Sequence, residues 1–180
     1  MNHPSTRLFL SLILVLGSAN AGTSNTGTPD DVFVRATGTD KSVAPDTEGI
    51  APIWSDEFPG TTLNSDHWNY DTGNGVNGWG NGELQNYTSS TDNVYVENGL
   101  LHIAVRELAD GSYTSGRLNT GGKVEVQYGV IKANISWPDV VEGLWPAFWT
   151  LGNTFPSTPW PACGTYTHAS LARSNTALYF

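Results

Sequence analysis

Apolar and polar side chains alternate along the chain from about Ile50 onward, and this period of two constrains the fold more than any other sequence feature. Gly, Pro, Asn and Asp interrupt the alternation every several residues, as they do between short antiparallel strands. We find no segment with the 3.6-residue apolar period of an ordinary helix. The pattern therefore predicts an all-β fold in which two sheets pack as a sandwich.

The clearest predicted element is a hairpin over Asn93–Arg106. Its turn, Asn98-Gly99, is the strongest short hairpin signal, because both residues tolerate the positive φ angles of a two-residue turn. After the turn, successive side chains alternate between the two faces of the strand. We expect one face to carry Leu101, Ile103 and Val105, and the other to carry His102, Ala104 and Arg106.

Two further strands are predicted, over Tyr128–Trp137 and Gly143–Leu151. The first places Ile131, Ala133, Ile135 and Trp137 on one face, and the second does the same for Trp145, Ala147, Trp149 and Leu151. Tryptophans two pleats apart could line a groove for successive sugar rings, because the C–H-rich face of a sugar packs on an indole. The alternative is that both tryptophans belong to the core.

The N-terminal residues are typical of an export signal. A basic start precedes the apolar run Leu8–Leu16, and Ala19-Asn20-Ala21 fits the small-x-small cleavage rule. We predict a signal peptide over residues 1–21 and a secreted, extracellular product, with an N-terminal anchor as the alternative. Residues 22–49 are poor in large apolar side chains, so they are predicted to form a flexible leader.

The charge and the cysteine content exclude several classes of protein. The formal net charge of −9 argues against nucleic acid and anionic membrane as partners, whereas a neutral polymer is compatible with it. Cys163 is the only cysteine, so no disulfide forms within the chain, and we expect a monomer held by its core. Asn86 and Asn134 each begin a sequon for N-glycosylation.

The loop Asp71–Glu83 is rich in glycine and contains Gly73-x-Gly75-x-x-Gly78. We reject a dinucleotide-binding loop, because that motif needs an apolar strand before it and a helix after it. The amide and carboxylate groups of the loop suit sugar hydroxyls, although a tight glycine-rich connection remains the alternative. The histidines are scattered, which gives a catalytic metal centre little support, and no Gly-x-Ser-x-Gly elbow is present.

Seven blocks of sequence, in one order across residues 53–164, resemble the laminarinase branch of glycoside hydrolase family 16. The blocks are Trp54–Phe58, Gly78–Gln85 with Tyr87–Thr88, Asn93–Leu101, Tyr113–Thr120, Tyr128–Gly129, Gly143–Trp149 and Trp160–Gly164. The resemblance implies a β-jelly-roll sandwich whose concave sheet binds β-1,3-glucan or mixed β-1,3/1,4-glucan and hydrolyses it internally with retention. That reaction uses two carboxyl groups about 5–5.5 Å apart.

The family supplies these carboxyl groups from a strand that reads Glu-x-Asp-x-x-Glu directly after Trp-Pro-Ala-Cys-Gly. Here Gly164 is followed by Thr165–Phe180, and no Asp or Glu occurs after Glu142. We therefore expect residues 50–164 to be the N-terminal part of the family domain, an incomplete jelly roll without hydrolytic activity. The aberrant tail, residues 165–180, is interpreted as translated intron, with an authentic divergent terminus as the alternative.

The resemblance also assigns individual residues. Trp145, Trp149, Arg117 and Asn81 match positions that bind glucan in the family, and no cofactor is expected for catalysis. Glu57 and the Gly99 carbonyl match two ligands of a structural calcium site. The competing interpretations of the chain are a non-catalytic β-glucan-binding module and a truncated product without function.

Overall fold

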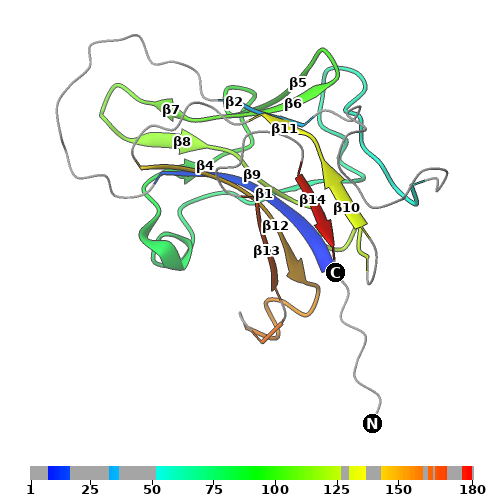
Figure 1. Ribbon diagram of the computed structural model, residues 1–180. Coiled ribbons are helices and arrows are strands. Elements are labelled where there is room, and N and C mark those ends of the chain that lie inside the picture. Colours follow the sequence, from blue (N-terminus) through cyan, green and yellow to red (C-terminus); the bar gives the residue numbers. More distant parts are fainter. Residues whose placement is uncertain are drawn as a thin grey trace.

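The computed structural model describes residues 8–16, 33–36, 52–126, 130–136, 143–159, 162–163, 165–169 and 176–179 (Figure 1). Nearly all regular structure in these ranges is β-strand, as the sequence predicted. The one helical element in them is the five-residue turn η1 (Gly78–Gly82). In the same ranges, no helix has the length and apolar character needed to cross a membrane.

The largest sheet has five strands in the order β13-β12-β1-β9-β3. All of its pairs are antiparallel, and β12 pairs with β1 along the full nine residues of β1. In Figure 1, β1 lies between β12 and β9. The strands are β1 (Leu8–Leu16), β3 (Asn69–Tyr70), β9 (Arg117–Asn119), β12 (Leu144–Gly152) and β13 (Thr165–Ala169).

A second, four-stranded sheet has the order β11-β2-β6-β5. Its strands β5 and β6 form the predicted hairpin, in which Glu97 pairs with Leu100 across the turn. Asn98 (φ 53°) and Gly99 (φ 72°) both have the positive φ that a two-residue turn of this kind requires. The strands are β2 (Phe33–Ala36), β5 (Val94–Glu97), β6 (Leu100–Ala104) and β11 (Ile135–Ser136).

Two smaller sheets complete the described part of the fold. One has the order β4-β8-β7, and the other pairs β10 with β14. The strand predicted over Tyr128–Trp137 is present as β10 and β11 with a break at Asn134, and the two ends of that prediction lie outside the described residues. The strands are β4 (Asn86–Tyr87), β7 (Arg106–Glu107), β8 (Tyr113–Ser115), β10 (Val130–Ala133) and β14 (Thr176–Tyr179).

The main core joins the two larger sheets, which confirms the predicted sandwich. Leu101 and Ile103 of β6 are fully buried, as is Leu118 of β9, and Phe148 of β12 packs in the same cluster. Burial of each such side chain contributes roughly 1.5–3 kcal/mol. The rest of the buried cluster consists of Phe58, Trp68, Val94, Val96, Ile135 and Leu144.

Segments that the sequence assigned to a signal, a leader and a tail contribute strands. Leu8–Leu16 form β1, Phe33–Ala36 pair with β6 and β11, and the tail provides β13 and β14. These pairings do not test whether residues 1–21 are cleaved or where residues 165–180 come from, so the signal peptide, leader and aberrant tail stay predictions. An extended segment pairs here because a strand edge carries unpaired N–H and C=O groups.

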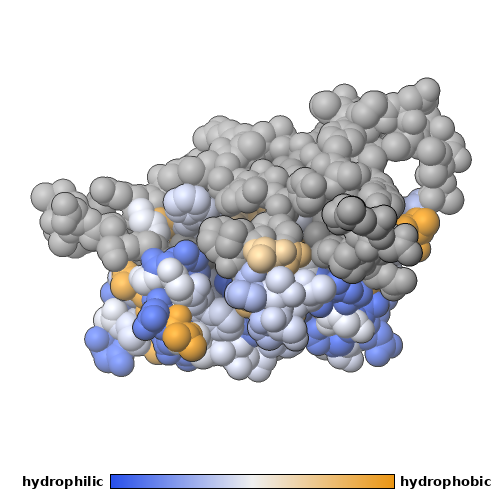
Figure 2. All heavy atoms as spheres, turned by 90° about the horizontal axis from the view of Figure 1, so that it is seen from below, coloured by the Kyte–Doolittle hydropathy of each residue, from blue (hydrophilic) through white to orange (hydrophobic). Residues whose placement is uncertain are grey.

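On the face of the molecule that Figure 2 shows, the coloured residues form no single large apolar patch. Figure 2 shows mainly polar and near-neutral side chains with separate apolar areas. Single exposed hydrophobic side chains are normal on soluble surfaces. The large ones are Ile53, Tyr70, Val76, Leu84, Leu108, Trp145 and Phe155.

Candidate functional site

The strands β9 and β12 turn one set of side chains toward the core and the other set toward the opposite face of the sheet. Leu118 and Phe148 are buried in the core. Trp145, two pleats from Trp149, is 52% exposed, while Trp149 is half-buried and packs with Ala147 apart from the main core. The predicted common face of this strand is therefore present, and Trp145 is a surface residue rather than a core residue.

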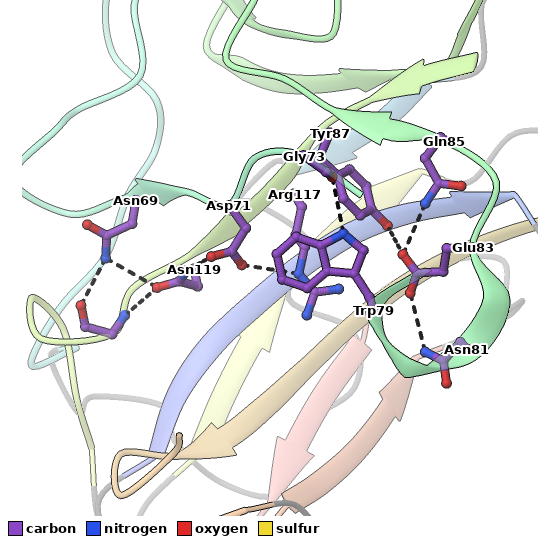
Figure 3. Close-up of polar contacts among 11 residues, drawn as sticks. Asn69, Asp71, Gly73, Trp79, Asn81, Glu83, Gln85, Tyr87, Arg117 and Asn119 are labelled. Carbon is purple, nitrogen blue, oxygen red and sulfur yellow. Dashed lines mark hydrogen bonds and ion pairs between the residues drawn. The ribbon is translucent and has the colours of Figure 1, made fainter. Parts of the chain in front are cut away.

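Arg117 is the centre of this opposite face (Figure 3). Its Nε–H donates to Asp71 Oδ2 over 3.1 Å. Its guanidinium carbon lies 4.4 Å from the ring centroid of Trp79, 5.8 Å from that of Tyr87 and 5.7 Å from that of Trp149. Contacts of a cation with aromatic faces within about 6 Å are attractive. The structure thus brings together two of the predicted binding residues, Arg117 and Trp149.

Asp71 is fixed by a chain of side-chain hydrogen bonds. Asn119 Nδ2 donates to Asp71 Oδ1 over 3.0 Å, while Arg117 occupies the other carboxylate oxygen. Asn69 Nδ2 in turn donates to Asn119 Oδ1 over 3.2 Å and to the Gly121 carbonyl over 2.9 Å. These residues come from β3, β9 and the segments next to them, so the sheet pairing itself sets the position of the carboxylate.

The glycine-rich loop is built from residues with positive φ. Asn77, Gly78, Trp79, Gly80 and Gly82 all lie in that region. A Cβ at Gly78 would lie 2.6 Å from the backbone nitrogen of Glu83, so a glycine is required there. The loop leads into the short strand β4 rather than into a helix, which agrees with the rejection of a dinucleotide-binding motif.

Glu83 is a buried carboxylate at the end of the loop. Asn81 Nδ2 donates to its Oε1 over 3.2 Å, and Gln85 Nε2 and the Tyr87 hydroxyl donate to its Oε2 over 3.1 and 2.8 Å. Burial and the neighbouring Glu83 raise the pKa of Tyr87 far above its usual range, so the tyrosine stays a neutral donor. The predicted binding residue Asn81 is exposed and held by one amide hydrogen bond.

Sequence reasoning did not single out Asp71, Gln85 or Tyr87 as site residues. The local sequence gave no clear signal for them, because the side chains that point inward here are polar: residues 83, 85 and 87 are buried, while Leu84 and Asn86 between them are exposed. The period of two therefore places polar side chains inward and an apolar one outward. Such inversion of the usual pattern marks a buried polar network rather than an ordinary core strand.

Glu57 and Gly99, the predicted calcium ligands, lie near each other in space. A Cβ built on Gly99 would be 3.8 Å from the backbone oxygen of Glu57, and the Glu57 side chain is exposed. Calcium takes six to eight oxygens, including carbonyl oxygens, and the part of the chain that the structure describes holds no group of three or more His, Cys, Asp or Glu side chains placed to bind a metal ion. A structural calcium site at Glu57 and Gly99 stays a prediction.

The two sequons differ in exposure. Asn86 is exposed on β4, and the hydroxyl of Thr88, which completes its sequon, donates to Asn93 Oδ1. Asn134 is only partly exposed between β10 and β11. A glycan on Asn86 would project into solvent, so the geometry favours Asn86 over Asn134 as a modification site.

A family model described as beta-glucan synthesis-associated protein SKN1/KRE6/Sbg1 matches residues 20–158. The chain is 37% identical over 164 residues to glucan endo-1,3-beta-glucosidase A1 of Niallia circulans, a match that covers 83% of this chain and 23% of that protein. It is 44% identical over 114 residues to the clotting factor G alpha subunit of Tachypleus tridentatus, covering 62% and 16% respectively. The chain thus spans less than a quarter of these two relatives.

The fold is also similar to solved structures. The crystal structure of laminarinase from Flavobacterium sp. UMI-01 matches with a TM-score of 0.59 and 34% identity, over 71% of this chain and 63% of that one. Together with the strand content, this similarity confirms the predicted fold class, a β-jelly-roll sandwich.

Proposed function

The chain belongs to the family described as beta-glucan synthesis-associated protein SKN1/KRE6/Sbg1, and from its site we propose that it binds β-1,3-glucan. The observation that carries the proposal is the exposed Trp145, which lies on the same face of the five-stranded sheet as Trp149 and the Arg117 cluster. An exposed indole on a sheet is suited to pack against the apolar face of a sugar ring. Laminarinases and glucan endo-1,3-beta-glucosidases among the similar proteins support the choice of polymer.

Each predicted binding residue has a distinct task in this proposal. Trp145 and Trp149 are about 13 Å apart along the strand, so they contact different parts of an extended ligand. Arg117 and Asn81 donate hydrogen bonds to sugar hydroxyls. Asp71 balances the charge of Arg117, and the chain as a whole is acidic, which suits a neutral polysaccharide better than an anionic one.

We propose that the chain as it stands does not hydrolyse glucan. The strand β13, which pairs with β12, holds residues 165–169, and none of them is Asp or Glu. A retaining hydrolase needs two carboxyl groups on opposite sides of the scissile bond. Asp71 and Glu83, the carboxylates of the described site, are both occupied by hydrogen bonds from neighbouring side chains.

The binding proposal is tested with insoluble β-1,3-glucan. The full chain should be retained on the polymer, and Trp145→Ala together with Trp149→Ala should reduce the retained fraction severalfold. Tyr95→Ala is the matched control, because Tyr95 is a partly exposed aromatic residue stacked on His102 in the other large sheet. An equal loss of the retained fraction in Tyr95→Ala, or an unchanged retained fraction in the tryptophan variant, would contradict the proposal.

The lack of hydrolysis is tested separately by the release of reducing sugar from laminarin. No release above a blank is expected from the purified chain. Measurable turnover would show that other carboxyl groups catalyse the reaction, and the proposed inactivity would then be wrong while binding could still stand. A chain without function should show no cooperative thermal transition by circular dichroism, so such a transition counts against that interpretation.

A further inference from the structure

Most of the N–H groups of the Arg117 side chain have no hydrogen-bond partner among the described residues. A guanidinium carries five N–H donors in a rigid planar fork. The Nε–H donates to Asp71, and the Arg117 side chain makes no other hydrogen bond to the described residues. The four N–H groups on the terminal nitrogens are therefore left for a ligand, provided that the side chain is held in place.

Aromatic contacts, rather than further hydrogen bonds, hold this side chain. The guanidinium carbon is closest to Trp79, at 4.4 Å from the ring centroid, and the Arg117 side chain is only 12% exposed. Figure 3 shows the guanidinium beside the indole, with Asp71 on one side and Tyr87 on the other. An arginine packed in this way loses little freedom when it binds a ligand, because its planar group is already oriented.

Trp79 is itself locked by three independent contacts. Its Nε1–H donates to the Gly73 carbonyl over 3.2 Å, and Tyr87 meets it edge-on with centroids 5.8 Å apart. A Cβ at Gly75 would lie 2.6 Å from Cδ2 of the indole, a carbon bonded to three ring atoms, so Gly75 packs on a face of the ring. Trp79 also has φ 56°, a costly conformation for a tryptophan, which persists only where the surroundings hold it.

We propose that Trp79 is a positioning residue that acts on glucan through Arg117, and that it is not a stacking platform for sugar. The proposal rests on the proposed function of the site. The ring contacts of Trp79 go to Arg117, Gly75 and Tyr87, whereas the 52% exposed Trp145 has an open ring. The loop from Gly73 to Gly82 therefore serves to hold an indole against an arginine.

A double-mutant cycle on soluble laminarin tests this assignment. Arg117→Met and Trp79→Ala should each weaken laminarin binding about tenfold, the size of effect expected for loss of an interaction near 1.4 kcal/mol. If Trp79 acts through Arg117, the double variant binds no more weakly than Arg117→Met alone. A multiplicative loss of about a hundredfold would overturn the proposal, because Trp79 would then contribute independently of Arg117.

Two further variants separate positioning from damage to the fold. Trp79→Phe keeps an aromatic face against Arg117 and should recover part of the binding lost in Trp79→Ala. Val76→Ala changes an 82% exposed residue of the same loop and should leave laminarin binding unchanged. Equal losses in Trp79→Phe and Trp79→Ala would contradict a role for the ring face.

A readout without ligand distinguishes failure of this inference from failure of the proposed function. In the free protein, the side-chain N–H signals of Arg117 should be shifted by the ring current of Trp79, and Trp79→Ala should remove that shift. If laminarin does not bind but the shift is lost in Trp79→Ala, the glucan proposal fails and the pairing stands. If Arg117 signals are unchanged in Trp79→Ala, the positioning role is wrong.

Discussion

The β5–β6 hairpin and the five-stranded sheet differ in how far apart in sequence their paired strands lie. The hairpin joins residues that are neighbours in sequence, through a turn of two residues. The five-stranded sheet joins β1 near the N-terminus to β12 and β9, which lie more than 90 residues further along the chain. Local sequence is enough to specify the hairpin, whereas the sheet that carries the candidate site depends on distant segments finding each other.

Of the changes considered, removal of residues 1–21 should reduce the stability of the five-stranded sheet the most. The deletion removes β1, the strand between β12 and β9, and leaves two sheet edges unpaired. We expect the five-stranded sheet to lose its cooperative unfolding transition, since the loss is comparable with the whole stability of a domain, about 5–15 kcal/mol. Thermal circular dichroism of the shortened and the full chain measures it.

Deletion of residues 1–7 alone is the matched control, because it leaves the range of β1 intact. That variant should unfold like the full chain. If the chain without residues 1–21 unfolds with an unchanged midpoint, β1 is not required for the sheet, and the contrast between the two regions is wrong.

Gly116→Ala should cause the next largest loss of stability. Gly116 lies next to β9 and packs against the β5–β6 hairpin, so it tests the contact between the two regions. An added Cβ would clash with Val94 Cγ2 and lie 3.1 Å from Ile103 Cγ2, so the hairpin would have to move. Overpacking of this kind costs about 1–3 kcal/mol. Denaturant unfolding should show the loss.

Val94→Ala provides the space that the new methyl group needs. In the Val94→Ala background, Gly116→Ala should therefore cost less than in the original chain, which is a coupling that a double-mutant cycle detects. Equal costs in both backgrounds would show that the close approach to Val94 is not the source of the destabilisation.

Tyr87→Phe should reduce the free energy of unfolding by a smaller amount, and that amount should depend on pH. At neutral pH it removes the hydrogen bond to the buried Glu83, at a cost of about 1–2 kcal/mol. The raised pKa of Tyr87 means that the folded state keeps the phenol neutral, so its contribution is complete below the ordinary pKa near 10 and falls as pH rises above it. Unfolding of both proteins at pH 7 and pH 11 should show the difference shrink, and a constant difference would contradict this.

The strands and the sandwich could be predicted because alternation and turn residues are local signals. Asn98-Gly99 identified the hairpin, and the alternation in Gly143–Leu151 predicted that Trp145 and Trp149 share a face, while leaving open whether that face is exposed. The partners of Arg117 could not be predicted in the same way. Asp71 and Trp79 lie dozens of residues from Arg117, and their contact follows from sheet register and from a loop with positive φ angles, which no local pattern encodes.

The range of β1 has two compatible descriptions, because it is predicted to be part of an export signal and it forms a strand in the structure. An apolar run such as Leu8–Leu16 satisfies both an export signal and a buried strand, because each requires only consecutive apolar residues. Polar residues that point inward, such as Glu83 and Gln85, were also beyond the pattern, because a period-two argument assumes that the inward side chains are apolar.

Ser112→Ala should change stability the least. Ser112 lies in the turn between β7 and β8, which, like the hairpin turn, joins residues that are neighbours in sequence. The hydroxyl and the backbone N–H of Ser112 donate to Asp110 Oδ1, and these bonds hold the pKa of Asp110 below its usual range. A carboxyl whose pKa is lowered in the folded state stabilises the fold at pH values above its ordinary pKa. This contribution is lost as the pH falls through the pKa of the folded state. In Ser112→Ala the carboxyl titration followed by NMR should move back toward the ordinary value, with little change in stability because Asp110 is exposed. An unchanged titration would mean that the backbone N–H alone sets the pKa, and that the local turn is fixed by its backbone rather than by the serine hydroxyl.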